Sequence, residues 1–314
     1  MKKYDVIVIG GGAAGLSGAM ALARSRRSVL VIDDATPRNA PAEGVHNYLT
    51  RDGIPPSELT AIGRQEVIGY GGEVVSGTVT TAGRDGDFTV GLADGTTYQG
   101  RRLLVTTGLV DVLPDVPGLA ERWGKDVLHC PYCHGWEVRD QAIGVLATSA
   151  MALHQVQMFR QLSDDITLFL HTAPELTEEQ WEELAARGIA VVQGKVEQLE
   201  VEDGKLTGVR LEGGNVIPRQ ALAVQTTVRA RANFLADLGL EPTVREANGV
   251  EIGTAIPVDA RGATEVPGVF AAGNVTDPMA QVMSSAAAGL MTGAGINFDL
   301  ITEETRLAVA ARSS

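Results

Sequence analysis

The sequence predicts an α/β protein that contains two Rossmann-like units. Two observations carry this prediction. A buried strand, a glycine-rich turn and a helix follow one another within the first 24 residues, and a strand–helix–strand pattern recurs over residues 142–170. Parallel strands connected through a helix are the repeating unit of such sheets. With 314 residues, the chain is long enough for two domains that each bury a core.

The composition is that of a globular protein, with 44% hydrophobic residues and 37 glycines. The apolar run near the start covers only Val6 to Ile9, which is too short for a signal peptide. No stretch of 18 apolar residues is present, so we expect no membrane span and a cytoplasmic location. The net charge of −13 argues against nucleic-acid binding, which requires a basic face.

The first unit has the order of elements that binds a dinucleotide. Residues 4–9 form a β-branched strand that enters a G-x-G-x-x-G turn over residues 10–15. A helix rich in Ala and Leu follows over residues 16–24, and the next strand, 28–32, ends on Asp33. Glycines let the backbone approach a pyrophosphate, and the carboxylate accepts hydrogen bonds from ribose hydroxyls. We therefore predict a dinucleotide site here.

The only two cysteines lie together in His129-Cys130-Pro131-Tyr132-Cys133-His134. Three chemistries compete for this motif: covalent haem attachment, zinc binding and a redox dithiol. Haem attachment takes place outside the cytoplasm, and zinc needs further ligands, for which no second knuckle exists among the other histidines. A redox dithiol therefore fits best, and we expect no metal.

Several further segments carry a family resemblance. They are a strand and turn over residues 266–277, a small-residue helix over residues 280–294, His46-Asn47-Tyr48, and residues 104–108. Together with the Cys-x-x-Cys motif they make the chain resemble the low-molecular-weight thioredoxin reductase family of flavoproteins over essentially its whole length. Asn274 stands where that family usually has Asp. Because an amide oxygen also accepts hydrogen bonds, we expect FAD to be retained.

The resemblance implies a thioredoxin reductase-like, three-layer ββα fold in which the second unit is inserted into the first. The FAD-binding domain would comprise residues 1–111 and 242–314, and the insert, residues 112–241, would carry the cysteines. A homodimer is also implied. The FAD contacts implied by the resemblance are Gly10, Gly12, Ala14, Gly15, Asp33, Arg38, His46, Asn47, Thr107, Gly108, Gly273, Asn274, Gln281 and Val282.

The second unit departs from the family at its nucleotide site. A strand over residues 142–146, a helix over 151–162 and a strand over 166–170 are predicted. The connecting turn, residues 147–152, reads Ala-Thr-Ser-Ala-Met-Ala, whereas the family has G-x-G-x-x-A. The family's arginine cluster for the NADPH 2′-phosphate is replaced, over residues 171–179, by a segment that contains carboxylates and no arginine. We therefore expect no NADPH binding.

The flanks of the cysteines narrow the resemblance. His134 replaces the usual Asp, and the pattern His-Cys-Pro-x-Cys-His-Gly resembles the FAD-dependent dithiol oxidases of dithiolopyrrolone and epidithiodiketopiperazine biosynthesis, such as those of holomycin and gliotoxin. That resemblance implies oxidation of a small-molecule dithiol to an intramolecular disulfide, with O2 as acceptor. It also implies that Cys133 faces the flavin and that Cys130 exchanges with substrate. His134 and His129 are both candidate bases, and a packing role for His129 stays open.

Two other functions remain as alternatives. One is a disulfide reductase that takes electrons from a donor other than NADPH, such as ferredoxin. The other is a flavoprotein sensor whose disulfide reports thiol status without turnover. Steady oxygen consumption with small dithiols distinguishes the oxidase from both.

Overall fold

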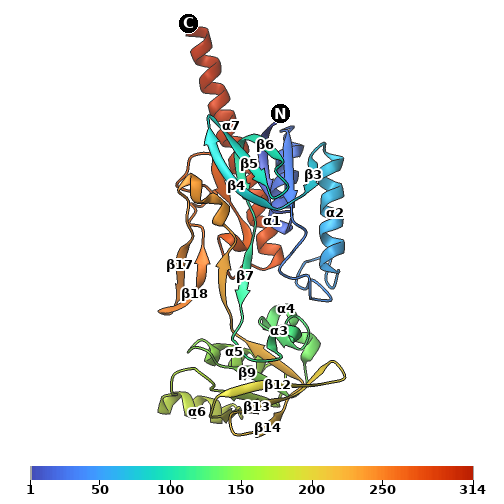
Figure 1. Cartoon of the computed structure of the whole chain (residues 1–314), viewed down its shortest axis with the longest axis vertical. Helices are drawn as coiled ribbons and strands as arrows, with labels where there is room; N and C mark the ends of the chain where they lie inside the picture. The colour runs from blue at the N-terminus through green and yellow to red at the C-terminus, as the bar shows by residue number, and fades with distance from the viewer. Residues whose placement is uncertain (1, 314) are drawn as a thin grey trace.

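The computed structural model describes residues 2–313 and shows two lobes connected by two neighbouring strands (Figure 1). The first lobe comprises residues 2–112 and 227–313, and the second lobe comprises residues 113–226. The chain leaves the first lobe through β7 (Leu109–Val112) and returns through β16 (Thr227–Ala230), which pairs antiparallel with β7. The prediction of one Rossmann-like unit inserted into another is confirmed.

The central sheet of the first lobe combines parallel and antiparallel strands. Its strands are β3 (Glu73–Ser76), β2 (Val29–Asp33), β1 (Lys3–Ile9), β6 (Thr97–Val105), β5 (Asp87–Leu92), β4 (Val79–Asp85) and β19 (Val269–Ala271). The parallel part comprises β3, β2, β1, β6 and β19. The antiparallel part lies at one side, where β5 pairs with β6 and β4 pairs with β5.

Alternating side chains of β1 build two cores. Val6 and Val8 pack on the helical face, whereas Ile7 and Ile9 pack on the face covered by β4, β5 and η2 (Asn233–Leu238). The helices of this lobe are α1 (Ala13–Arg24), α2 (Pro56–Gly69) and α7 (Val282–Ser313). Helices α1 and α7 approach closely because Gly289 has no side chain: a Cβ there would lie 1.9 Å from the Ala14 carbonyl oxygen.

The second lobe has a five-stranded parallel sheet with a different layer on each face. Helices α5 and α6 cover one face, and a three-stranded antiparallel sheet covers the other. Its strands are β8 (Val127–Leu128), β9 (Ile143–Leu146), β10 (Ile166–Phe169), β11 (Ala190–Val192) and β15 (Ala221–Val224), then β12 (Val196–Glu202), β13 (Lys205–Leu211) and β14 (Val216–Pro218). Its helices are α3 (Leu119–Arg122), α4 (Pro131–His134), η1 (Trp136–Val138), α5 (Ala152–Phe159) and α6 (Glu178–Ala186).

The end of the insert differs from the expected boundary at residue 241. Strands β7, β16, β18 (Val250–Ala255) and β17 (Thr243–Ala247) form one sheet, and residues 230–240 contribute Ala230, Ala232, Leu235 and Leu240 to the core of the first lobe. By packing, the insert therefore ends near residue 226. A pairing between β16 and β7, more than 100 residues apart, leaves no local signal in the sequence.

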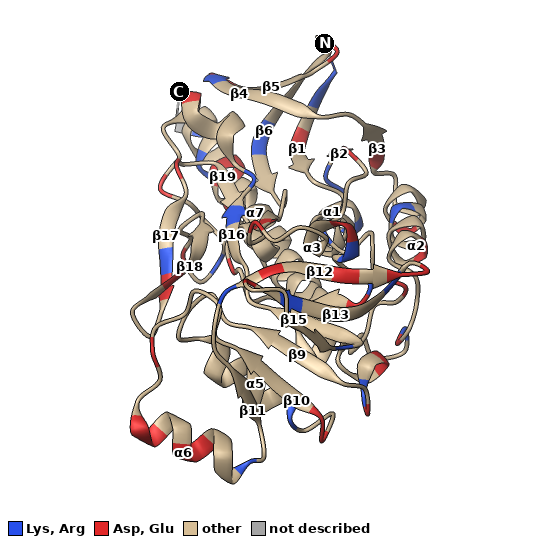
Figure 2. Cartoon of the chain, turned by 60° about the horizontal axis from the view of Figure 1, so that its bottom comes forward, with Lys and Arg blue, Asp and Glu red and all other residues tan. Residues whose placement is uncertain are grey.

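The surface carries both signs of charge. In the cartoon of Figure 2, positions of Lys and Arg are scattered among those of Asp and Glu, and acidic residues gather on α6. No helix within residues 2–313 combines the length and the apolar character needed to cross a bilayer.

Candidate active site

A cavity of about 1660 Å³ brings the glycine-rich turn and the cysteine motif together. Its walls include residues 9–14, 32–42, 44–46 and 106–109 of the first lobe, and residues 128–130, 133 and 134 of the second lobe. Pockets for small ligands usually measure about 300–1,000 Å³. The space is therefore sufficient for a large cofactor and for a small molecule beside it.

The glycine-rich turn in the cavity wall is suited to bind an anion. Helix α1 begins after Gly12, no side chain caps its N-terminus, and its first turn carries no acidic residue. A Cβ on Gly12 would have no protein atom within 4 Å, although the residue lines the cavity. Exposed N–H groups at a helix start, approachable because a side chain is absent, fit the pyrophosphate of a dinucleotide.

Gly15 acts behind this surface rather than in it. A Cβ on Gly15 would lie 1.9 Å from the carbonyl oxygen of Gly10, so the residue permits the close approach of α1 to the turn. Ala14 lines the cavity, and Gly273 lies behind it, since a Cβ on Gly273 would lie 2.8 Å from the Ala14 Cβ. Gly15 and Gly273 therefore shape the predicted cofactor site without lining it.

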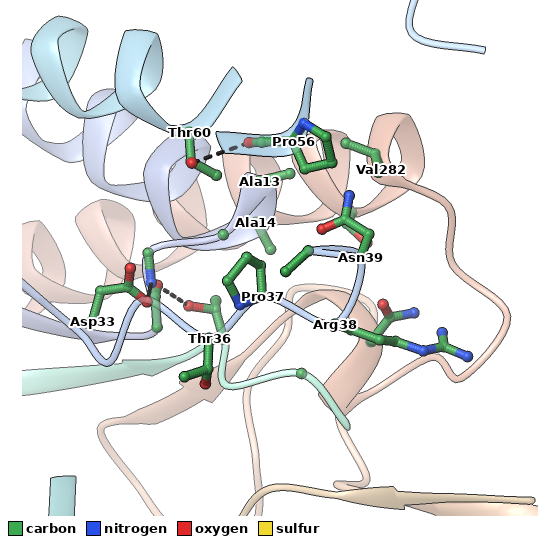
Figure 3. A pocket seen from close by; sticks show the side chains of 18 of the residues that line it. Ala13, Ala14, Asp33, Thr36, Pro37, Arg38, Asn39, Pro56, Thr60 and Val282 are labelled. Atoms are coloured by element: carbon green, nitrogen blue, oxygen red, sulfur yellow. Dashed lines mark hydrogen bonds between the residues drawn. The ribbon is translucent and has the colours of Figure 1, made fainter. Parts of the chain in front are cut away.

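Asp33 and Arg38 lie at opposite ends of one cavity-lining segment, with Thr36 and Pro37 between them (Figure 3). The Gly11 backbone N–H donates to Asp33 Oδ1 at 2.9 Å, and Arg64 pairs with Oδ2. This fixes the carboxylate at the edge where a ribose is expected. Arg38, by contrast, donates both Nε and Nη2 to the largely buried carboxylate of Asp111, at 2.7 and 2.6 Å.

A further part of the cavity wall is formed by Thr107 and Gly108 after β6, by Asn274, and by Gln281 and Val282 at the start of α7. Asn274 Nδ2 donates to the carbonyl oxygens of Ala280 and Asp277, at 2.8 and 3.1 Å. Its Oδ1 remains as the acceptor for a ribityl hydroxyl. These residues fit FAD.

His46 and Asn47 contact the second lobe. Asn47 is not among the cavity-lining residues: its Nδ2 donates to the Tyr132 carbonyl oxygen at 2.6 Å. His46 lines the cavity, and its Nε2 lies 3.3 Å from Glu137 Oε1. The expectation that Asn47 touches the cofactor is not supported by this geometry, because its side chain is engaged between the two cysteines.

The cysteines lie at the start and third position of a single helical turn. Cys130 precedes α4, and its carbonyl oxygen accepts the N–H groups of Cys133 and His134 at 3.2 and 3.1 Å. Both residues line the cavity as thiols; Cys130 is half-buried and Cys133 is exposed. The hydrogen bond from Cys133 lowers the pKa of Cys130 from its ordinary value of 9.0 to about 7, and the same bond raises the pKa of Cys133.

Two histidines flank this pair and also line the cavity. His129 Nδ1 lies 3.1 Å from the Val224 carbonyl oxygen, so Nδ1 donates and Nε2 is left as an acceptor. Burial lowers the pKa of His129 and of His134 below the ordinary value of 6.5. Both rings are therefore neutral near pH 7, the form in which an imidazole accepts a proton.

The nucleotide crevice of the second unit is small. The cavity at the end of β9 measures about 140 Å³ and is lined mainly by apolar residues. Its polar lining residues are Ser149, Glu175, Thr177 and Gln180. Leu153 and Leu176 pack against the core beside it, and Thr172 N donates to the Ala147 carbonyl oxygen at 3.3 Å. This volume lies well below the range of about 300–1,000 Å³ typical even of drug-sized ligands.

Four residues of the site carried no role in the sequence analysis. Asp111 binds Arg38 directly. Thr226 acts through Asp111, because its Oγ1 donates to the Asp111 carboxylate at 3.0 Å. Glu137 faces His46, and Gln155 Nε2 donates to the His129 carbonyl oxygen at 2.8 Å. Each acts across elements far apart in sequence, which explains why no local motif revealed it. Within residues 2–313, no group of three or more His, Cys, Asp or Glu is placed to hold a metal ion.

Comparison with known proteins shows the family of the chain. The family model described as pyridine nucleotide-disulphide oxidoreductase matches residues 4–293. A thioredoxin reductase, sirT, of Leptosphaeria maculans is 33% identical, with 99% of this chain and 97% of the relative covered. A second, tcpT of Claviceps purpurea, is also 33% identical, with 95% of each covered.

Solved structures support the same assignment. The crystal structure of HlmI has a TM-score of 0.90 at 45% identity and covers 98% of this chain and 96% of its own. An oxidoreductase from Agrobacterium tumefaciens has a TM-score of 0.88 at 34% identity, with 96% and 99% covered. The chain therefore belongs to the pyridine nucleotide-disulphide oxidoreductase family, as a thioredoxin reductase-like, FAD-dependent thiol/disulfide oxidoreductase.

Proposed function

We propose that this enzyme is a dithiol oxidase that closes an intramolecular disulfide in a small-molecule dithiol of the dithiolopyrrolone or epidithiodiketopiperazine type. The electrons go to O2, which becomes H2O2. One observation carries the proposal: the cysteines share the large cavity with the dinucleotide turn, while the second nucleotide crevice measures only about 140 Å³. Electrons therefore enter through the thiols, and NADPH is not used.

Bound FAD would supply a two-electron acceptor for the enzyme dithiol and a route from it to O2. The residues that would hold it are the α1 N-terminus and Asp33 at the adenosine end, and Thr107, Asn274 and the start of α7 at the flavin end. Their fit rests on the uncapped helix start, the Gly12 surface and the amide oxygen of Asn274.

The exchange steps use the Cys-x-x-Cys pair in its disulfide form. A substrate thiolate attacks the sulfur of Cys130, the Cys130–Cys133 bond breaks, and Cys133 leaves as a thiolate. The second substrate thiolate then attacks the substrate sulfur of the mixed disulfide and releases Cys130. The product is a cyclic disulfide, the two electrons of the substrate dithiol reside on the enzyme pair, and its two protons have passed to bases beside the pair.

Two neutral imidazoles beside the pair are suited to remove the substrate protons. His134 directly follows Cys133, and the Nδ1–H bond of His129 to Val224 orients its Nε2 as an acceptor. The low pKa of Cys130, about 7, makes this residue a good leaving group in the resolving step.

We also propose a homodimer in the cytoplasm. Helix α7 exposes Met283, Leu290, Met291, Phe298 and Ile301, which is an unusual concentration of large apolar side chains for a surface helix. The only two cysteines both belong to the redox motif, so none is left for the structural disulfides of secreted proteins.

Oxygen consumption tests the proposed reaction. The purified enzyme, with a small dithiol and no NADPH, should consume O2 steadily and release one H2O2 per disulfide formed. A protein that reduces its flavin once and then stops would be a sensor. One that turns over only when ferredoxin supplies electrons to a disulfide substrate would be a reductase.

A further inference from the structure

A loop of the first lobe contacts the cysteine-bearing segment of the second lobe at two points. This loop, residues 46–52, lies before α2, and the segment, residues 130–138, comprises α4 and η1. One contact reaches the backbone between the two cysteines, and the other reaches the side chain of Glu137. The two lobes are therefore tied together directly at the redox motif.

The first contact is made by Asn47. Its Nδ2 donates to the Tyr132 carbonyl oxygen at 2.6 Å, and its backbone N–H donates to Asp52 Oδ1 at 2.8 Å. Asn47 has a φ of +60°, a conformation that Asn and Asp tolerate better than most residues. The loop thus holds the amide in a fixed position, and the amide fixes the turn that carries both sulfurs.

The second contact is made by His46, whose ring lies between two carboxylates. Its Nε2 is 3.3 Å from Glu137 Oε1, and its Nδ1 is 3.4 Å from Asp52 Oδ2. Glu137 follows His134 by three residues, and its charge raises the pKa of His134 against the effect of burial. Glu137 therefore contacts the first lobe and acts on a candidate base at the same time.

We propose that His46 and Asn47 are positioning residues that clamp the Cys-x-x-Cys turn over the cofactor cavity. The residues through which they act are Glu137 and the Tyr132 backbone carbonyl. The proposal rests on the proposed function in one respect, since it assumes that the enzyme dithiol passes its electrons to bound FAD. Electron transfer between a thiolate and a ring requires contact, so a turn free to move away would slow this step.

Asn47→Asp removes the Nδ2 donor while keeping the shape and the positive φ. We expect the flavin of this variant to be reduced by dithiothreitol roughly threefold to tenfold more slowly in anaerobic stopped flow, the worth of one hydrogen bond. In a Cys130→Ser background, the long-wavelength absorbance from the Cys133 thiolate against oxidised flavin should also fall. It is measured on the high-pH plateau, where the thiolate is fully formed, so a pKa change cannot produce the loss.

A double-mutant cycle tests the second contact. If His46 and Glu137 act as a pair, the variant with both replaced by Ala should reduce its flavin no more slowly than the slower of the two single variants. Leu49→Ala is the matched control, because Leu49 lies on the same loop with a side chain 78% exposed. It should behave as the unmodified enzyme in both measurements.

Three results would overturn the clamp. The first is an unchanged rate of flavin reduction and unchanged long-wavelength absorbance in Asn47→Asp and Glu137→Ala. The second is additive effects of the His46 and Glu137 substitutions in the double-mutant cycle. The third is loss of FAD from the Asn47 and His46 variants, which would make these two residues cofactor ligands. The two contacts are tested by separate variants, so one that failed to fold would leave the other decisive. These measurements follow a single reduction of the flavin and need no O2. An enzyme that never uses O2 would therefore contradict the proposed function, while the clamp would still be tested.

Discussion

Replacing Cys133 by alanine tests how the Cys130 thiolate is stabilised. In the reduced enzyme the pKa of Cys130 is lowered from 9.0 to about 7, and the largest cause is the hydrogen bond from the Cys133 thiol. Cys133→Ala removes that donor and retains the weaker backbone bonds. We therefore expect the pKa of Cys130 to return toward 9.0. Cys133→Ser keeps an O–H donor and should lie between the two.

The size of the effect follows from two opposing terms. At pH 7, a pKa of about 7 leaves about half of the thiol ionised, and a pKa of about 9 leaves about 1%, a loss of about 50-fold. A thiolate of higher pKa is more nucleophilic. With a Brønsted slope of about 0.4–0.5, a rise of two units in the thiol pKa increases the rate constant of the thiolate about eightfold. Alkylation of Cys130 at pH 7 should therefore slow by about sixfold in Cys133→Ala.

The assay is the rate of iodoacetamide labelling of reduced protein between pH 5.5 and 10, with Cys130 identified by peptide mass. Because only the thiolate reacts, the rate in the unmodified enzyme should rise with pH, pass its midpoint near pH 7 and level off above about pH 8. In Cys133→Ala the plateau should begin about two units higher. An inflection that stays near pH 7 in Cys133→Ala would refute the assignment and would place the stabilisation in the backbone or in Arg38.

Three further predictions concern other parts of the site. His134→Ala should lower turnover near pH 7 by roughly 10²–10⁴, and the loss should shrink toward about pH 8.5, where substrate thiols ionise unaided; a larger, pH-dependent loss in His129→Ala would assign the base to His129. Asn274→Asp should weaken FAD binding by roughly tenfold, since it replaces the donor to two carbonyl oxygens by an acceptor. Equilibrium dialysis against FAD measures this, and unchanged affinity would contradict it. Met291→Glu with Phe298→Glu should convert a dimer to a monomer in sedimentation, whereas an unmodified enzyme that already sediments as a monomer would remove the homodimer proposal.

Local signals were sufficient for the first nucleotide unit. The strand, the three glycines, the helix and Asp33 follow one another within 33 residues, and the structure places them as predicted, with Gly11 bound to Asp33. The cysteine motif could also be recognised in the sequence, because its chemistry depends on spacing within four residues. The altered turn at residues 147–152 was also visible in the sequence, and a small crevice is found beside it.

Contacts between the lobes were not predictable from one sequence. Asn47 was expected at the cofactor, yet its partner is a backbone carbonyl 85 residues later, which no residue pattern encodes. The end of the insert was misplaced because β16 and η2 pack on elements of the first lobe. Helix α7 was expected to end near residue 294 but continues to Ser313. Residues 296–313 contain no Gly or Pro and so favour helix, and Arg27 and Arg101 pair with Glu304.

The central claim, that electrons enter from a dithiol and not from NADPH, is tested most directly by anaerobic stopped flow. Enzyme with FAD is mixed with NADPH, with NADH or with dithiothreitol, and the loss of the flavin absorbance is followed. We expect rapid bleaching by dithiothreitol and no bleaching at a useful rate by either nucleotide. Fast bleaching by NADPH would contradict it and would make this enzyme an ordinary NADPH-dependent reductase.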